Sequence, residues 1–405
     1  MSGVKILLVG LVMLAACGGV RSHVPAEGDG VVLQKVLDGA LPAKEGFAEI
    51  TQAGGLPIAT SKGFLFVVAD GGLGPYSVTS PSHAFLDTPL KTEHGVGWAL
   101  VPVAAPDGAT YRFVTHFGDS GPDKLAHRFL YPHGDEVSYV TMSGPHLDRW
   151  PSIGDANVAP RTLRVWVPAQ PPTHFMYAHD GQNLFDPAAN FNGWWLQEAA
   201  GPATLVVGID NGSARLDEYT PSRDVINGQP VGGKGDLYTD FVELTVRPFI
   251  EAHYGKPKRS GVMGSSLGGV IAYEQVLRHP GTWDFVASLS GTMGWGSIGP
   301  TTHNPTLIQL YAALPACPAP TFYLDSGGGP GSGCIAGEGE VIRDDSPDPN
   351  NPASDNYCEN AQLNEALVAL GCGPRLTYKW APGAQHAESY WRGRAPGIFR
   401  LFESL

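Results

Sequence analysis

A short glycine-rich segment has the residue types and spacing of a catalytic serine turn. Gly264-Ser265-Ser266-Leu267-Gly268 matches the pattern G-x-S-x-G, directly after an apolar run at 261–263 and before a helical pattern at 268–278. A sharp turn between a strand and a helix exposes the serine hydroxyl, and the flanking glycines leave room for its strained backbone. The motif predicts Ser266 as the nucleophile of an acyl-transfer reaction. The alternative is a structural turn whose serine has no reactive role.

A serine hydroxyl is a weak nucleophile, so it needs a base, and the base needs an acid that orients it. Where the serine sits on such a turn, the chain order is serine, acid, histidine. His386 lies just after the last predicted strand, at 376–380, and is the expected base. Because the carboxyl ends of parallel strands meet at one sheet edge, we expect Ser266 and His386 at that edge.

The acid is expected on the long segment after the predicted strand at 321–324. Five carboxylates are candidates: Asp325, Asp344, Asp345, Asp348 and Asp355. Asp355 is favoured because it would cap the next predicted helix, at 356–370, whereas Asp325 continues the strand and is expected to be structural. A role for Asp355 as an N-cap alone is the alternative. The acidic segment could also bind calcium, but it lacks the EF-hand spacing, which favours a solvated loop without a metal.

The oxyanion of an acyl-transfer reaction needs two backbone N–H donors. One is expected from the residue after the nucleophile, Leu267, and the other from a loop after an early strand. The segment His179-Asp180-Gly181-Gln182 follows the predicted strand at 173–177, so the N–H of Gln182 is the expected second donor. This chemistry requires neither a metal nor an organic cofactor.

The elements that carry these residues alternate between strands and helices. Strands are predicted at 163–167, 173–177, 205–209, 261–263, 285–289, 321–324 and 376–380, and helices at 236–253, 268–278 and 356–370. This alternation predicts an α/β fold, with a mostly parallel sheet flanked by helices, over residues 155–405.

The sequence before this region has a different pattern. Short runs rich in Val, Phe, Tyr and Trp lie between Gly, Pro and Asp, which predicts a small all-β sandwich over residues 27–145, with no long helix. Residues 142–162 are rich in Gly and Pro and are expected to form a linker. Four aromatic residues of the sandwich are expected in its core, with stacking on sugars as the alternative: Tyr76, Trp98, Tyr111 and Phe113.

The first residues have the features of an export signal. Lys5 precedes a short apolar stretch at 6–16, which is too short to span a bilayer. The segment Leu14-Ala15-Ala16-Cys17 resembles the lipobox of bacterial lipoproteins, which implies lipidation of Cys17 and a signal and tether over residues 1–22. The alternative is an ordinary signal peptide that is cut elsewhere.

Four cysteines remain after Cys17, an even number that suggests disulfides in an exported chain. Cys317 and Cys372 each precede a predicted strand, so adjacent parallel strands would bring them to the same sheet end. We therefore expect Cys317–Cys372 and Cys334–Cys358, with four free buried thiols as the alternative.

Several ordered segments resemble the bacterial "putative esterase" family of α/β-hydrolases, which includes the esterase D, feruloyl esterase and enterochelin esterase branches. They are the segments at 176–186, 207–211 with 217–221, 263–269, 323–327 and 386–391. The resemblance covers about residues 160–405 and implies a triad of Ser266, Asp355 and His386. The chain departs from the family in its long cysteine-bearing insertion after Gly327. The N-terminal region is faintly similar to the early-set modules that precede some of these esterases and can bind glycans.

Composition limits the partners. The chain has 405 residues and a formal net charge of −13 at pH 7, which disfavours binding to nucleic acid. We predict an exported serine ester hydrolase, held on the cell envelope by a lipid anchor, that acts on carbohydrate-linked, siderophore or short-chain esters. The alternatives are an acyltransferase of the same fold and an inactive glycan-binding surface lipoprotein. The sequence leaves the oligomeric state and the particular ester open.

Overall fold

The structure is a computed structural model that describes residues 29–405, except 73, 75, 120, 300–301, 332, 337–341 and 345–354. The predicted signal and tether at 1–22, with Cys17, lie outside the described residues. So do Asp345 and Asp348. No helix in the described part combines the length and the apolar character needed to cross a membrane.

The larger part of the molecule contains a sheet that positions the serine turn near its centre. Its strands run in the order β22-β19-β18-β17-β13-β14-β12-β11. The strands from β22 to β14 are parallel, whereas β12 and β11 are antiparallel. Their bounds are β11 (His146–Ile153), β12 (Arg161–Val167), β13 (His174–His179), β14 (Thr204–Ile209), β17 (Arg259–Ser265), β18 (Phe285–Leu289), β19 (Thr321–Ser326) and β22 (Leu376–Trp380).

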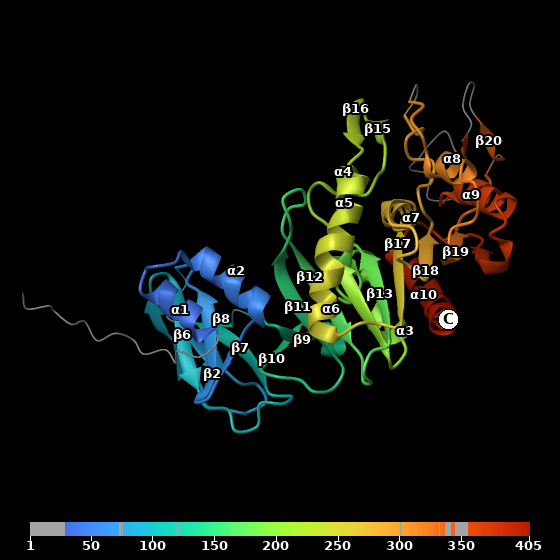
Figure 1. Cartoon of the computed structure of the whole chain (residues 1–405). Coiled ribbons are helices and arrows are strands. Elements are labelled where there is room, and N and C mark those ends of the chain that lie inside the picture. The colour runs from blue at the N-terminus through green and yellow to red at the C-terminus, as the bar shows by residue number, and fades with distance from the viewer. Residues whose placement is uncertain are drawn as a thin grey trace, which may run out of the picture.

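Helices cover both faces of this sheet, which explains why its central strands are continuously apolar. One face packs against α5 (Gly235–Phe241), α6 (Arg247–Tyr254), α7 (Leu267–Arg278), α8 (Leu307–Ala312) and α9 (Tyr357–Ala369). The other packs against α3 (Leu196–Ala199) and α10 (Glu388–Glu403). Figure 1 shows the α5–α6 helix in front of the sheet and α9 near β19. The predicted α/β-hydrolase class is confirmed.

Shorter elements connect this framework. They are α4 (Arg215–Glu218), the hairpin β15 (Arg223–Ile226) and β16 (Gln229–Gly232), the pair β20 (Ile335–Ala336) and β21 (Arg343–Asp344), the π-helical segment η4 (Val242–Val246), and the 3-10 turns η2 (Gly181–Asn183), η3 (Asn190–Asn192) and η5 (Gly373–Arg375). The helix predicted at 236–253 is therefore α5 and α6 joined through η4.

The N-terminal part contains two packed sheets. One has the strand order β1-β2-β6-β5, with β1 (Ile58–Thr60), β2 (Gly63–Ala69), β5 (Lys91–Glu93) and β6 (Val96–Val101). The other extends the large sheet beyond β11, through β9 (Arg128–Leu130), β10 (Val137–Tyr139), β7 (Thr110–Thr115), β3 (Tyr76–Thr79) and β4 (Thr88–Pro89), with β8 (Gly118–Asp119) beside β7. The turn η1 (Pro132–Gly134) lies between β9 and β10.

Two helices of this part were not predicted. They are α1 (Gly30–Leu37) and α2 (Ala43–Ala53), which cover the outer face of the four-stranded sheet. The valines of α1 and the glycine in α2 weaken the helical signal in the sequence. Gly46 is explained by packing, because a Cβ there would lie 2.2 Å from Val36 Cγ2. Tertiary contact between the helices therefore decides their formation.

The predicted linker at 142–162 is wrong, because β11 lies in the middle of it. This strand joins the two parts into one sheet through β9 and β12. Its charged residues Asp148 and Arg149 are buried. Asp148 pairs with Arg128, and Arg149 pairs with Glu136. Burial of these charges is tolerated because each has an ionic partner.

The four aromatic side chains considered for sugar stacking lie in the core. Their exposed fractions are only 2–5%: Tyr76, Trp98, Tyr111 and Phe113. The stacking interpretation is therefore wrong for these rings. The structure also contains the disulfides Cys317–Cys372 and Cys334–Cys358, with the pairing expected from the sequence.

Candidate active site

The serine turn connects β17 to α7 at the carboxyl edge of the sheet. Ser266 has φ 54° and ψ −126°, a conformation that L-residues rarely adopt. Its backbone N–H donates to the carbonyl oxygen of Leu289 at 3.0 Å, which fixes the turn against β18. A Cβ on Gly264 would lie 2.4 Å from the backbone of Gly268, so this position requires glycine. The flanking glycines thus allow the turn to close.

The hydroxyl of Ser266 faces the loop that follows β18. Its Oγ lies 3.5 Å from Thr292 Oγ1, and Thr292 Oγ1 accepts a hydrogen bond from Asn356 Nδ2 at 3.2 Å. Within the described residues, no hydrogen bond joins Ser266 to His386. The two residues nevertheless lie on loops at the same edge, because β17 and β22 are parallel members of one sheet.

His386 is hydrogen-bonded to Asp355, with 2.7 Å between Nδ1 and Oδ1. The Asp355 side chain has no exposed surface, whereas the imidazole is 32% exposed. The Trp391 ring packs edge-on against the imidazole, with 4.9 Å between the ring centroids. Because a carboxylate only accepts, the proton lies on Nδ1 of the neutral imidazole, and Nε2 keeps a free lone pair. This is the tautomer that a general base requires.

The second oxygen of Asp355 is held by two further donors. Oδ2 accepts from Ser290 Oγ at 2.7 Å and from the backbone N–H of Gly327 at 2.6 Å. A Cβ on Gly327 would lie 2.2 Å from that oxygen, so glycine allows this close approach. Asp355 does not cap α9: the N-cap residue is Asn356, and no side-chain capping bond is formed. The expectation that Asp355 caps this helix is therefore wrong.

Asp325 lies beside this pair but points elsewhere. Its buried carboxylate pairs with Arg394 at 2.9 Å and accepts from Tyr323 Oη at 2.8 Å. Burial raises the pKa of Asp325 to about 6, against the opposing effect of Arg394. The structure thus brings Asp355 to His386, whereas Asp325 pairs with Arg394 and accepts the backbone N–H of Ser290 at 3.2 Å. The side chain of Asp344 is outside the described part of the chain.

The two backbone amides expected at the oxyanion lie on the turns that follow β13 and β17. No backbone hydrogen bond among the described residues uses the N–H of Leu267 or of Gln182. Gln182 is fixed through its side chain, because Oε1 accepts the backbone N–H of Asn211 at 3.1 Å. A Cβ on Gly181 would lie 2.7 Å from the backbone of Gly208, so the turn runs tightly against β14.

A part-buried ion pair supports the Gln182 turn. Asp180 has a left-handed backbone, with φ 62°, and its carboxylate accepts from Arg215 Nε at 2.7 Å and Nη2 at 2.8 Å. Next to it, burial lowers the pKa of His179 to about 3, so this imidazole is neutral. The turn is therefore held by the Asp180–Arg215 ion pair and does not depend on a protonated His179.

Sequence reasoning missed the residues that hold the triad. Ser290, Thr292 and Arg394 stand in no recognisable motif; the first two lie on the loop after β18, and Arg394 lies on α10. Only the position of Ser290 directly after a predicted strand could have drawn attention to it.

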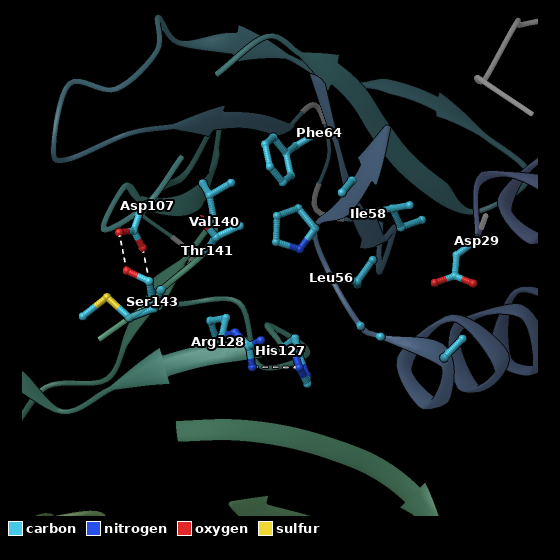
Figure 2. Close-up of a pocket in the computed structure, with 16 residues that line it drawn as sticks. Asp29, Leu56, Ile58, Phe64, Asp107, His127, Arg128, Val140, Thr141 and Ser143 are labelled. Carbon is cyan, nitrogen blue, oxygen red and sulfur yellow. Dashed lines mark hydrogen bonds between the residues drawn. The ribbon is translucent and has the colours of Figure 1, made fainter. Parts of the chain in front are cut away.

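No cluster of three or more metal-ligating side chains occurs among the residues that the structure describes. A separate cavity of about 710 Å³ lies in the N-terminal part. Figure 2 shows that its polar residues bond to each other, Asp107 with Ser143 and His127 with Arg128. None of the triad or oxyanion residues lines this cavity.

Comparison with known proteins connects this geometry to a family. Residues 158–332 match the family model described as "Putative esterase". The resemblance recognised in the sequence is confirmed over that stretch. It contains Ser266, Leu267 and Gln182, and it ends before Asp355 and His386.

Curated relatives are similar to part of the chain. The uncharacterized protein YbbA of Bacillus subtilis is 28% identical over 145 residues, which are 33% of this chain and 55% of that protein. The siderophore triacetylfusarinine C esterase of Aspergillus fumigatus is 28% identical over 138 residues, which are 31% and 47% of the respective chains. The chain thus spans about half the length of the curated relatives it matches. An IroE-like serine hydrolase structure from Shewanella oneidensis is 18% identical and covers 64% of this chain and 80% of its own, with a TM-score of 0.47.

Proposed function

We propose that the chain is a serine-dependent carboxylic ester hydrolase with a triad of Ser266, His386 and Asp355. His386 Nε2 takes the proton of Ser266 Oγ as that oxygen attacks the ester carbonyl. The N–H groups of Leu267 and Gln182 bind the oxyanion of the tetrahedral intermediate. The alcohol leaves with the proton from His386, and water then releases the acid from the acyl-enzyme by the same steps.

One observation carries this proposal. A serine at φ 54° on a strand-to-helix turn lies at the same sheet edge as an imidazole whose Nδ1 is 2.7 Å from a buried carboxylate. The strained serine costs about 1–3 kcal/mol, which persists only where the surrounding structure enforces it. The family match of residues 158–332 supports ester hydrolysis as the reaction.

One relative supports a proposal on the substrate class. One of them is named a siderophore esterase, so we include siderophore esters with carbohydrate-linked and short-chain esters as candidates. We also propose that the protein is exported and lipidated at Cys17. The two disulfides support export, because such bonds persist in oxidising compartments.

The test compares the wild type with Ser266→Ala on p-nitrophenyl acetate and on a panel of siderophore, feruloyl and acetyl-xylan esters. We expect the variant to lose activity by about 10⁶-fold while it keeps the wild-type fold. A fluorophosphonate probe should label Ser266 in the wild type only. Wild-type turnover by the variant would refute the proposed nucleophile. Adding a competing alcohol separates hydrolysis from acyl transfer, because a transferase would form a new ester.

A further inference from the structure

Ser290 occupies a buried position between the acid of the triad and the C-terminal helix. It directly follows β18, has φ 49°, and its exposed fraction is 0%. A residue with a side chain is strained in this left-handed conformation, where glycine would be free. The strain at this serine directs attention to the contacts that its hydroxyl makes.

The hydrogen bonds around Ser290 Oγ determine the direction of its proton. Trp391 Nε1 lies 3.1 Å away and Arg394 Nη2 lies 3.0 Å away. Both groups can only donate, so they take the two lone pairs of the hydroxyl. The single O–H must then point to Asp355 Oδ2, at 2.7 Å. All three bonding positions of the hydroxyl are used.

This arrangement fixes the state of the carboxylate. Asp355 Oδ2 receives the O–H of Ser290 and the N–H of Gly327, so a proton on that oxygen would oppose two donors. Oδ1 remains free to accept from His386 Nδ1. The charge on Arg394, 3.9 Å from Oδ2, acts in the same direction.

We propose that Ser290 is a positioning residue of the ester hydrolase. Its hydroxyl, oriented by Trp391 and Arg394, keeps the Asp355 carboxylate turned toward His386. This inference rests on the proposed function, because it assigns Ser290 a role within that triad. The C-terminal helix α10 thus connects His386 with Ser290. It begins just after His386, and it carries Trp391 and Arg394, the two donors to Ser290 Oγ.

A purely structural role for Ser290 makes a different prediction. In that case, loss of the hydroxyl would lower stability and leave turnover by the folded protein unchanged. Tyr311→Phe supplies a matched control, because Tyr311 Oη donates a buried hydrogen bond to the carbonyl oxygen of Tyr273 at 3.0 Å and makes no hydrogen bond to Asp355, Ser290 or Arg394 within the described residues. Ser290→Gly removes the hydroxyl and relieves the backbone strain, so this variant is expected to fold. Ser290→Ala removes the hydroxyl without changing the strain.

The kinetic experiment measures kcat and KM on p-nitrophenyl acetate, together with thermal unfolding, for all three variants and the wild type. A hydrogen bond to a charged group corresponds to about a 10- to 100-fold effect, so kcat should fall by that factor in both Ser290 variants. KM should change less than about twofold, because Ser290 touches no substrate. Tyr311→Phe should keep kcat within about threefold even where its stability falls. Unchanged kcat in both Ser290 variants, or an equal loss in Tyr311→Phe, would overturn the proposal.

A second measurement does not need turnover. The proton shared by His386 Nδ1 and Asp355 should give a downfield proton resonance that Asp355→Asn abolishes. We expect Ser290→Gly to shift or broaden this resonance and Tyr311→Phe to leave it in place. A resonance that is identical in Ser290→Gly would overturn the positioning role even if the wild type hydrolysed none of the esters tested.

Discussion

Replacing Asp355 by asparagine tests which carboxylate orients the base. Three donors point at Asp355, namely His386 Nδ1, Ser290 Oγ and the backbone N–H of Gly327. An asparagine amide offers one oxygen and one NH₂ group. An NH₂ group in the place of Oδ2 would face two other donors, Ser290 Oγ and the N–H of Gly327. In the place of Oδ1 it would face only His386 Nδ1.

The asparagine should therefore direct its NH₂ group at His386 Nδ1. The imidazole can accept this bond only by moving its proton to Nε2, and it then has no lone pair for the proton of Ser266. Loss of the correct tautomer in a serine triad reduces kcat by about 10⁴-fold, which corresponds to about 5 kcal/mol of transition-state stabilisation. The side chains have nearly the same shape, so the fold should persist.

The assay compares kcat of Asp355→Asn and Asp325→Asn on p-nitrophenyl acetate near neutral pH, with circular dichroism as a check on folding. Asp325→Asn should lose no more than about 100-fold, the largest effect expected for Ser290, because Asp325 reaches His386 only through Arg394 and Ser290. A loss of about 10⁴-fold in Asp325→Asn, with Asp355→Asn nearly active, would show that the acid is assigned to the wrong residue.

Three further predictions concern the surroundings of the site and its stability. Burial raises the pKa of Glu274 from 4.5 to about 7. Between these pH values the folded state keeps a proton that the unfolded state has released. The free energy of unfolding should therefore fall as the pH rises from about 4.5 to about 7. Glu274→Gln should remove this fall and stabilise the protein by up to about 3 kcal/mol at about pH 8, as measured by urea unfolding at both pH limits. Gly327→Ala should reduce kcat by about 100-fold, because the new Cβ, 2.2 Å from Asp355 Oδ2, must displace the acid; a kcat near that of the wild type would contradict this close approach. Replacing Cys317 and Cys372 by alanine opens a loop with a sequence separation of 55 and should cost about 4 kcal/mol of stability, with no change in unfolding midpoint as the opposing result.

The sequence predicted the elements that carry local signals. The strand at β2 and the helix after Ser266 were identified because their apolar residues repeat with the period of the element. The strand β11 and the helices α1 and α2 were missed, since their local patterns are polar or weakly helical. Asp148 in β11 is buried only because Arg128, from β9, lies next to it. Such pairing across strands leaves no trace in the sequence of either strand.

The same division applies to the proposed site. The residue types and spacing of Gly264–Gly268 determined by themselves that a strained serine turn would follow a central strand, because only short-range backbone geometry is needed. The choice between Asp325 and Asp355 depended on tertiary structure. Both are buried acids near one end of the sheet. The Asp355 carboxylate contacts His386, whereas the Asp325 carboxylate pairs with Arg394. The hydroxyl of Ser290 likewise gains its orientation from donors on a helix about 100 positions away, so only the folded chain assembles that contact.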